Sequence, residues 1–168
     1  MGTPLDRSGA GADPGLDGAE GAEGAVEIRG FEPADIPAAL VLWREAHGVV
    51  LRDADEPVAV QRYLQRNAGT SFVALFGARV IGTVLCGHDG RRGYLYHLAV
   101  ARAYRGRGIA RALAARALEA LRHDGIDKCH LTVVAGNAEA RAFWTATGWQ
   151  LRTDVVLMSC TAPGSPNA

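Results

Sequence analysis

Short apolar segments and longer stretches with helical spacing alternate along the chain, which predicts a domain that mixes strands and helices. Ile109, Leu113, Ala117 and Leu121 recur at helical spacing, and Gly125 ends that helix. The other helices and the strands follow from the same kind of pattern. Strands are predicted at 26–29, 71–76, 80–86, 92–100, 128–134 and 155–160, and helices at 33–47, 57–65, 106–123 and 138–147. The order βααβββαβαβ predicts an α/β (α+β) fold with a mixed sheet and helices on both faces.

The two ends of the chain differ in composition from the part between them. Residues 1–24 consist mostly of Gly, Ala, Asp and Glu, with too few aliphatic side chains for a core, so we expect a disordered acidic tail. Residues 162–168 are predicted to be a second disordered tail. One domain is expected over 25–161, because a chain of 168 residues is long enough for a single core.

Composition excludes several classes of protein. No apolar run approaches the ~20 residues of a membrane span, and the N-terminus lacks the basic start and apolar stretch of a secretory signal. Cys86, Cys129 and Cys160 are scattered, without C-x-x-C or zinc spacing. We therefore expect a cytoplasmic protein with reduced thiols, no metal site and no membrane partner.

Charge is distributed unevenly, although the formal net charge is zero. Residues 1–25 carry five acidic side chains against Arg7 alone, a net charge of −4, so the rest of the chain carries +4. A mildly basic body suits a ligand that bears phosphates. It also raises the rival hypothesis of a nucleic-acid binder that uses Arg91, Arg92, Arg102, Arg105, Arg107 and Arg111. The neutral total and the absence of a reader helix argue against that rival.

The most informative segment is the strand Tyr94–Val100 with the Gly- and Arg-rich loop Tyr104–Arg111 that follows it and begins a long helix. Free N–H groups and the helix dipole make such a helix start a ready anion site. A P-loop is excluded because Ile109 and Ala110 follow Gly108, and the dinucleotide fingerprint is excluded because Arg111 takes the place of its third Gly. The pattern that fits is Arg-x-x-Gly-x-Ala, from Arg105 to Ala110.

This loop resembles the pyrophosphate-binding loop of the GCN5-related N-acetyltransferase (GNAT) superfamily. Two further segments support the resemblance: 131–149, with Asn137, Ala140, Phe143, Trp144 and Gly148 at the family's spacing, and 82–93, which is similar to the strand-three region of small bacterial members. The resemblance covers residues 26–160. It implies the GNAT fold, with a mostly antiparallel sheet, and an acetyl-CoA-dependent N-acetyltransferase.

The resemblance also implies where acetyl-CoA binds. The loop would wrap the pyrophosphate with its backbone N–H groups, and strand four would splay from strand five so that its backbone pairs with the pantetheine. Asn137 would contact pantetheine, cap the next helix, or do both. The residues implied to bind acetyl-CoA are Leu98, Ala99, Val100, Arg105, Gly106, Arg107, Gly108, Ile109, Ala110, Arg111, Asn137, Phe143 and Trp144.

The expected reaction is direct attack of a primary amine on the acetyl carbonyl, with a backbone N–H in the region of Leu98 as the oxyanion donor. The family's usual acid, a Tyr, is replaced by Trp144, and its usual Glu bases by Thr132 or Tyr94. Tyr96 and His97 are therefore the candidate bases, with His88 and His47 behind them and a water relay as the alternative. A strict period of two places Tyr94, Tyr96 and Leu98 on one face and His97 on the other, unless a bulge near Leu98 alters this.

The acceptor is expected over the first two helices and the loop between them. Asp53, Asp55 and Glu56 in that loop either attract a cationic amine or form a solvated turn. Arg91 and Arg92 either grip an anionic group or lie in a solvent-exposed turn. The acceptor, a small molecule or a protein, and a homodimeric state stay open. Because Trp144 replaces the usual acid, the alternative function is a non-catalytic acyl-CoA-binding module.

Overall fold

The computed structural model describes residues 25–46 and 48–161. The two predicted tails, 1–24 and 162–168, and the candidate base His47 lie outside the described residues.

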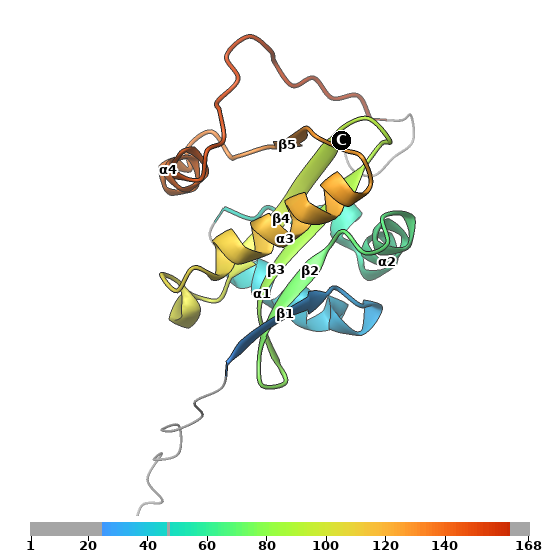
Figure 1. Ribbon diagram of the computed structural model, residues 1–168, viewed down its shortest axis with the longest axis vertical. Helices are drawn as coiled ribbons and strands as arrows, with labels where there is room; N and C mark the ends of the chain where they lie inside the picture. The colour runs from blue at the N-terminus through green and yellow to red at the C-terminus, as the bar shows by residue number, and fades with distance from the viewer. Residues whose placement is uncertain (1–24, 47, 162–168) are drawn as a thin grey trace, which may run out of the picture.

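A five-stranded sheet forms the centre of the fold, with its strands in the order of the chain (Figure 1). Neighbouring strands are antiparallel, except that the last two run parallel. This confirms the mixed, mostly antiparallel sheet. The strands are β1 (Val26–Gly30), β2 (Phe72–Phe76), β3 (Arg79–His88), β4 (Gly93–Val100) and β5 (Cys129–Leu131).

Helices cover both faces of the sheet, as the sequence predicted. On one face, α1 (Ile36–Glu45) and α2 (Pro57–Arg66) enclose a core that includes Trp43 and Val60. On the other, α3 (Ile109–His123) lies across the strands and encloses a second core around Leu113 (Figure 1). Three short 3-10 turns, η1 (Pro33–Asp35), η2 (Asp53–Asp55) and η3 (Arg102–Tyr104), precede α1, α2 and α3.

The C-terminal part of the chain departs from the sequence prediction. No strand forms over 155–160, where Val156 and Met158 are 85% and 87% exposed, and β5 ends at Leu131 instead of continuing to Val134. The last helix, α4 (Ala138–Ala146), stands off beside the sheet and has no buried residue (Figure 1). A strand needs a paired neighbour for its backbone groups. Because β5 is short, it offers no edge along which 155–160 could pair, so the apolar pattern alone predicted a strand wrongly.

The two valines of the first turns of α2 test how far burial stabilises the fold. Val60 is fully buried against α1 and the sheet, whereas Val58 is 75% exposed. We expect Val60→Ala to lower the free energy of unfolding by about 1.5–3 kcal/mol, because it removes buried methyl groups and leaves a cavity. The measurement is urea denaturation followed by circular dichroism. Val58→Ala is the matched control, since it makes the same change in helix propensity at an exposed site and should shift stability by no more than ~0.5 kcal/mol. Equal effects of the two substitutions would contradict the assigned core.

Candidate functional site

The parallel pairing between β4 and β5 covers only three residue pairs, Gly93–Cys129, Tyr94–His130 and Leu95–Leu131. Beyond Leu95, β4 continues to Val100 and stays paired with β3 on its other side. The two strands therefore diverge, and among the described residues the second half of β4 has no strand beside it on the β5 side. Apart from the Val100 carbonyl, which accepts a hydrogen bond from Arg105 Nε, its backbone groups on that side are available to a ligand.

A cleft of about 510 Å³ lies where the strands diverge. Four parts of the chain line it: the end of β4, the loop and first turn of α3, α4 with the residue before it, and the segment after α1. The predicted residues that line this cleft are Leu98, Ala99, Val100, Arg105, Gly106, Gly108, Ile109, Ala110, Arg111, Asn137, Phe143 and Trp144. The structure thus brings together twelve of the thirteen residues that the sequence proposed for acetyl-CoA binding, all except Arg107.

The loop before α3 presents unpaired backbone N–H groups to this cleft. Gly106 and Gly108 have φ angles of +76° and +79°, a conformation that strains any other residue, and a Cβ at either position would meet only open space. Gly108 is the N-cap of α3, and no side chain caps the helix there. In the described chain, backbone bonds in this region involve the N–H groups of Tyr104 and Arg105 and then resume at Ala112. The intervening N–H groups lie at the positive end of the helix dipole, an arrangement that favours negatively charged groups.

The arginines of this loop have different positions. Arg105 lines the cleft, and its Nε donates a hydrogen bond to the Val100 carbonyl at 3.0 Å, which ties the loop to the end of β4. Arg111 also lines the cleft. Arg107 does not: its guanidinium lies 5.3 Å from the centre of the Tyr104 ring and donates to the Ala103 carbonyl. The predicted role of the Arg107 side chain in the cleft is therefore not supported by its position.

Asn137 has the capping role that the sequence allowed, and it also lines the cleft. Its Oδ1 accepts a hydrogen bond from the Ala140 N–H at 2.9 Å and thereby begins α4. A Cβ on Gly48 would collide with the Asn137 side-chain amide. The segment after α1 therefore touches the start of α4, and Ala46 and Val49 from this segment help to line the cleft.

Trp144 is a wall of the cleft and part of an aromatic cluster. Its ring packs edge-on against Phe143 and Trp149, with ring centroids 5.0 and 4.9 Å away. An indole N–H does not supply a proton to a leaving group at neutral pH. Trp144 can shape the cleft but cannot act as the acid that a Tyr would be at this place.

A bulge in β4 changes which side chains share a face. Thr83 pairs with Ala99 and Leu85 with Tyr96, so the single residue between them on β3 faces both His97 and Leu98. His97 is the one non-glycine residue of the described chain with a positive φ, +47°. Tyr96 and His97 therefore both face α1 and α2, and Leu98 packs against the core beneath α3. The strict period of two was wrong here, and the bulge that the sequence left open is present.

His97 contacts the loop between α1 and α2. Its Nε2 lies 2.5 Å from Oδ1 of Asp55, and its ring lies 4.5 Å from the ring of Trp43. Asp55 is buried, whereas Asp53 and Glu56 are exposed. The acidic loop is thus not a uniformly solvated turn, because one of its three carboxylates is buried against His97.

An aromatic cluster continues along the same face of β4. Tyr94 stacks on Tyr96, Tyr63 of α2 meets Tyr96 edge-on, and His130 of β5 lies 5.7 Å from Tyr94. Burial raises the pKa of Tyr63 and, to a smaller degree, that of Tyr96, where Tyr94 and Cys129 add to the effect. Both phenols therefore stay protonated at neutral pH. The Tyr63 hydroxyl is buried and has no hydrogen-bond partner in the described part of the chain.

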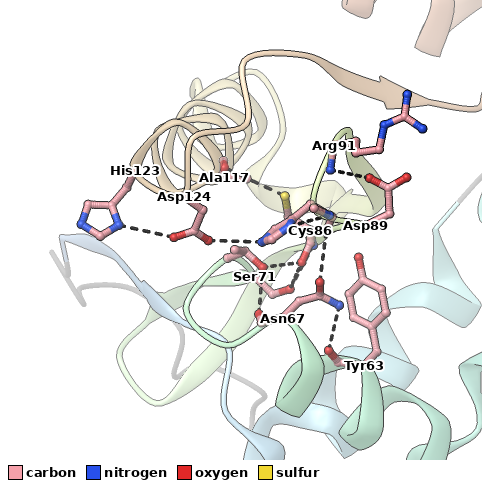
Figure 2. Close-up of polar contacts among 12 residues, drawn as sticks. Tyr63, Asn67, Ser71, Cys86, Asp89, Arg91, Ala117, His123 and Asp124 are labelled. Atoms are coloured by element: carbon pink, nitrogen blue, oxygen red, sulfur yellow. Dashed lines mark hydrogen bonds and ion pairs between the residues drawn. The ribbon is translucent and has the colours of Figure 1, made fainter.

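The remaining candidates lie away from the cleft. His88 lies at the end of β3, where its Nε2 is 3.4 Å from Asp124, just beyond the C-terminal end of α3. Figure 2 shows Asp124 in this region, together with the network of Ser71 and Cys86 and the contact of Asp89 with Arg91. The cleft lies at the opposite end of α3, so His88 is no candidate base. Arg91 and Arg92 are exposed, and Asp89 accepts hydrogen bonds from their N–H groups, as expected of a solvent-exposed turn.

Sequence reasoning missed several residues of the site. Tyr104, Glu139 and Ala140 line the cleft, and the one-turn spacing of Ala140 from Asn137 and Trp144 on α4 was a signal for that residue. No local sequence pattern indicates the contact of Trp43 with Thr83 or that of Asp55 with His97, since the residues of each pair are 40 or more positions apart in the chain.

Neither a metal-binding cluster of side chains nor a membrane-spanning helix is found among the described residues. Within residues 25–46 and 48–161, no group of three or more His, Cys, Asp or Glu side chains is placed to hold a metal ion. The helices of the described chain include none that is long and apolar enough to cross a bilayer.

Known proteins similar to this chain agree with this architecture. The profile of the Acetyltransferase (GNAT) family matches residues 36–149. Acetyltransferase SG1711 of Sodalis glossinidius is 31% identical over 134 residues, which are 79% of this chain and 93% of that protein. Acetyltransferase ECA0875 of Pectobacterium atrosepticum is 36% identical over 113 residues, which are 67% of this chain and 79% of that protein.

A solved structure is similar in fold. That of the PaiA N-acetyltransferase of Thermoplasma acidophilum, a complex with coenzyme A, superposes with a TM-score of 0.67 at 18% identity and covers 76% of this chain and 91% of that one. The chain therefore belongs to the GNAT family of acetyltransferases.

The three cysteines differ in environment, and this can be tested with a thiol reagent. Cys86 is buried, and burial raises its pKa to about 12; Cys129 is half-buried, and burial raises its pKa to about 11. Cys160 is exposed. Because the thiolate is the reactive form, we expect one thiol to react rapidly with Ellman's reagent at pH 8 in the native protein and three after unfolding. Cys160→Ser should abolish the rapid phase, and rapid labelling that persists in this variant would contradict the assigned burial.

Proposed function

We propose that this protein transfers the acetyl group of acetyl-CoA to a primary amine by direct attack of the amine on the thioester. One observation carries the proposal: the uncapped start of α3 and the unpaired half of β4 face the same cleft. An anion site at one end and free strand backbone at the other suit a ligand that joins a pyrophosphate to an amide-containing arm.

The residues in the cleft fit acetyl-CoA part by part. The N–H groups of residues 106–111 suit the pyrophosphate, and the side chains of Arg105 and Arg111 add positive charge beside them. The backbone of Leu98–Val100 suits the two amides of pantetheine, and its inner end near Leu98 is where a backbone N–H would face the thioester oxygen. Bound acetyl-CoA supplies an activated acetyl group, and the chain supplies orientation and the oxyanion donor.

The acceptor reaches the thioester from the α1 and α2 side of β4. That side presents the partly exposed ring of Tyr96, the stacked ring of Tyr94 and the exposed carboxylate of Glu56. Aromatic faces and carboxylates both attract a cation. This surface therefore supports a small-molecule amine that is cationic before it reacts.

The atoms of the reaction balance without a metal or a redox partner. The ammonium form of the acceptor first loses one proton to water, which frees the nitrogen lone pair. The neutral amine nitrogen then forms the new N–C bond and loses a second proton to a base, the C–S bond of the thioester breaks, and the leaving thiolate takes a proton from water. Trp144 replaces the side chain that would otherwise protonate the thiolate, and a CoA thiolate is stable enough to leave before it is protonated.

Gly108 gives the most direct test of the anion site. We expect Gly108→Trp to weaken binding of acetyl-CoA at least 100-fold in isothermal titration calorimetry, because the indole would occupy the space beyond the Cβ position and the backbone would leave its left-handed conformation. Gly125→Trp is the matched control: Gly125 lies at the other end of α3, has a φ of +75° and also faces open space. This control should bind acetyl-CoA as wild type does. Unchanged affinity in folded Gly108→Trp would contradict the proposal.

An assay of thiol release separates an enzyme from a binding module. With acetyl-CoA and a panel of polyamines, aminoglycosides, amino acids and peptides, we expect at least one amine to accelerate CoA release in proportion to enzyme concentration. The assay is best run on Cys160→Ser, which removes the exposed thiol of the protein. Tight binding of acetyl-CoA without transfer to any amine would favour the non-catalytic acyl-CoA-binding module.

A further inference from the structure

Asp55 and His97 lie side by side just before the part of β4 that lines the cleft, which begins at Leu98; neither of the two residues lines the cleft itself. The contact between His97 Nε2 and Asp55 Oδ1 is 2.5 Å, and the two side chains are 16% and 10% exposed. The other carboxylate oxygen, Oδ2, accepts a hydrogen bond from the Arg52 N–H at 2.8 Å. Two hydrogen bonds thus fix the carboxylate, and among the described residues it has no Lys or Arg partner within salt-bridge distance.

The imidazole and its backbone are also held in place. The Trp43 ring lies against the His97 ring, and Trp43 Nε1 donates to Thr83 Oγ1 at 2.8 Å. Thr83 Oγ1 in turn donates to the His97 carbonyl at 3.0 Å, at the residue with the positive φ. Most side chains disfavour the positive φ that His97 adopts. Hydrogen bonds that run from α1 through β3 to the bulge of β4 therefore stabilise this backbone conformation.

The contact with Asp55 determines which ring nitrogen can take up a proton. A carboxylate has no proton to donate, so the shared proton belongs to His97 Nε2, and Nδ1 keeps its lone pair. His97 Nδ1 has no hydrogen-bond partner in the described part of the chain and is not among the buried unpaired atoms there. Leu98, the next residue in the chain, lines the cleft, as does Ala46 at the end of the helix that carries Trp43.

We propose that Asp55 and His97 form a catalytic pair, in which Asp55 holds the ring in its Nε2–H form and His97 Nδ1 accepts the proton of the acceptor amine. This inference rests on the proposed function and assigns the base that the reaction requires. As the N–C bond forms, the amine proton passes to Nδ1, Asp55 stabilises the resulting imidazolium, and the proton is later released to water. His97 is the catalytic residue of the pair, and Asp55 is a positioning residue that acts through it.

The other candidate on this face is less suited to be a base. Tyr96, next to His97, is 42% exposed. Partial burial of its phenol and the neighbouring Tyr94 and Cys129 raise its pKa, so that it stays protonated at neutral pH. A protonated phenol donates a hydrogen bond and does not take a proton. Tyr96 therefore suits a contact with the acceptor, and His97 suits the proton transfer.

The first test is Asp55→Asn, with Asp53→Asn as its matched control. Asparagine can still accept the Arg52 N–H, so the turn is retained, but its amide would donate to Nε2 and place the ring proton on Nδ1. We expect Asp55→Asn to lower kcat about 100-fold, within the range of general base catalysis, with the KM for acetyl-CoA changed less than threefold. Asp53 lies in the same 3-10 turn, is exposed and has no contact with His97, so Asp53→Asn should leave kcat unchanged.

The second test asks whether Asp55 acts through His97. His97→Asn is the suitable variant, because asparagine tolerates a positive φ better than most residues. It should lower kcat at least as much as Asp55→Asn, and the double variant should be no slower than His97→Asn alone. Independent, multiplying losses would overturn the pairing.

The third test needs neither acetyl-CoA nor an acceptor. Nitrogen-15 NMR of histidine-labelled protein, with the His97 signals assigned by their loss in His97→Asn, should show the Nε2–H tautomer in wild type and in Asp53→Asn. In Asp55→Asn the Nδ1–H tautomer should prevail. An Nδ1–H ring in wild type, or a tautomer unaffected by Asp55→Asn, would overturn the proposal. Failure of acetyl-CoA to bind wild type would instead count against the proposed function, so the two outcomes are distinguishable.

Discussion

The free backbone of β4 is the constraint on which the rest of the site depends. After Leu95 the strand loses β5 as a neighbour but keeps β3 on its other side. Its second half is therefore held rigidly, while its polar groups on the β5 side have no strand partner among the described residues. Only a short connection, 101–108, separates the end of β4 from the first turn of α3. The uncapped N-terminus of α3 therefore lies at the same cleft. The hydrogen bond from Arg105 to the Val100 carbonyl fixes the position of the loop before α3 relative to the end of β4.

The bulge of β4 orients His97, the proposed base, beside this cleft. Without it, Tyr96 and His97 would lie on opposite faces of the sheet, and His97 could not reach Asp55. The positive φ of His97 costs of order 1 kcal/mol, and the buried bonds among Trp43, Thr83 and the His97 carbonyl offset it. One extra residue in a strand thus turns the His97 side chain toward α1 and α2, and residues from α1, η2 and β3 hold it there.

The sequence predicted much of the fold and of the cleft because both depend on local signals. The glycines before Ile109 and the asparagine before α4 are recognisable by spacing alone, and their positions at two helix starts place the residues around them. The predicted strand at 155–160 was wrong because an apolar pattern does not say whether a partner strand is present. The face of His97 and its contact with Asp55 could not be derived either, since both depend on a bulge and on tertiary contacts across 42 residues of chain. Local sequence signals thus predict the residues that line the cleft, whereas the position of the proposed base depends on tertiary packing.

Hydrogen–deuterium exchange with and without acetyl-CoA measures most directly whether the ligand is held by main-chain groups. Slower exchange is predicted for the amides of 98–100 and 106–111 when acetyl-CoA binds, because these N–H groups would become hydrogen-bonded or shielded by the ligand. Exchange at the turn of residues 89–92, beyond the far end of the sheet, should stay the same. Unchanged exchange in both segments at saturating acetyl-CoA, or protection confined to another surface, would contradict the account.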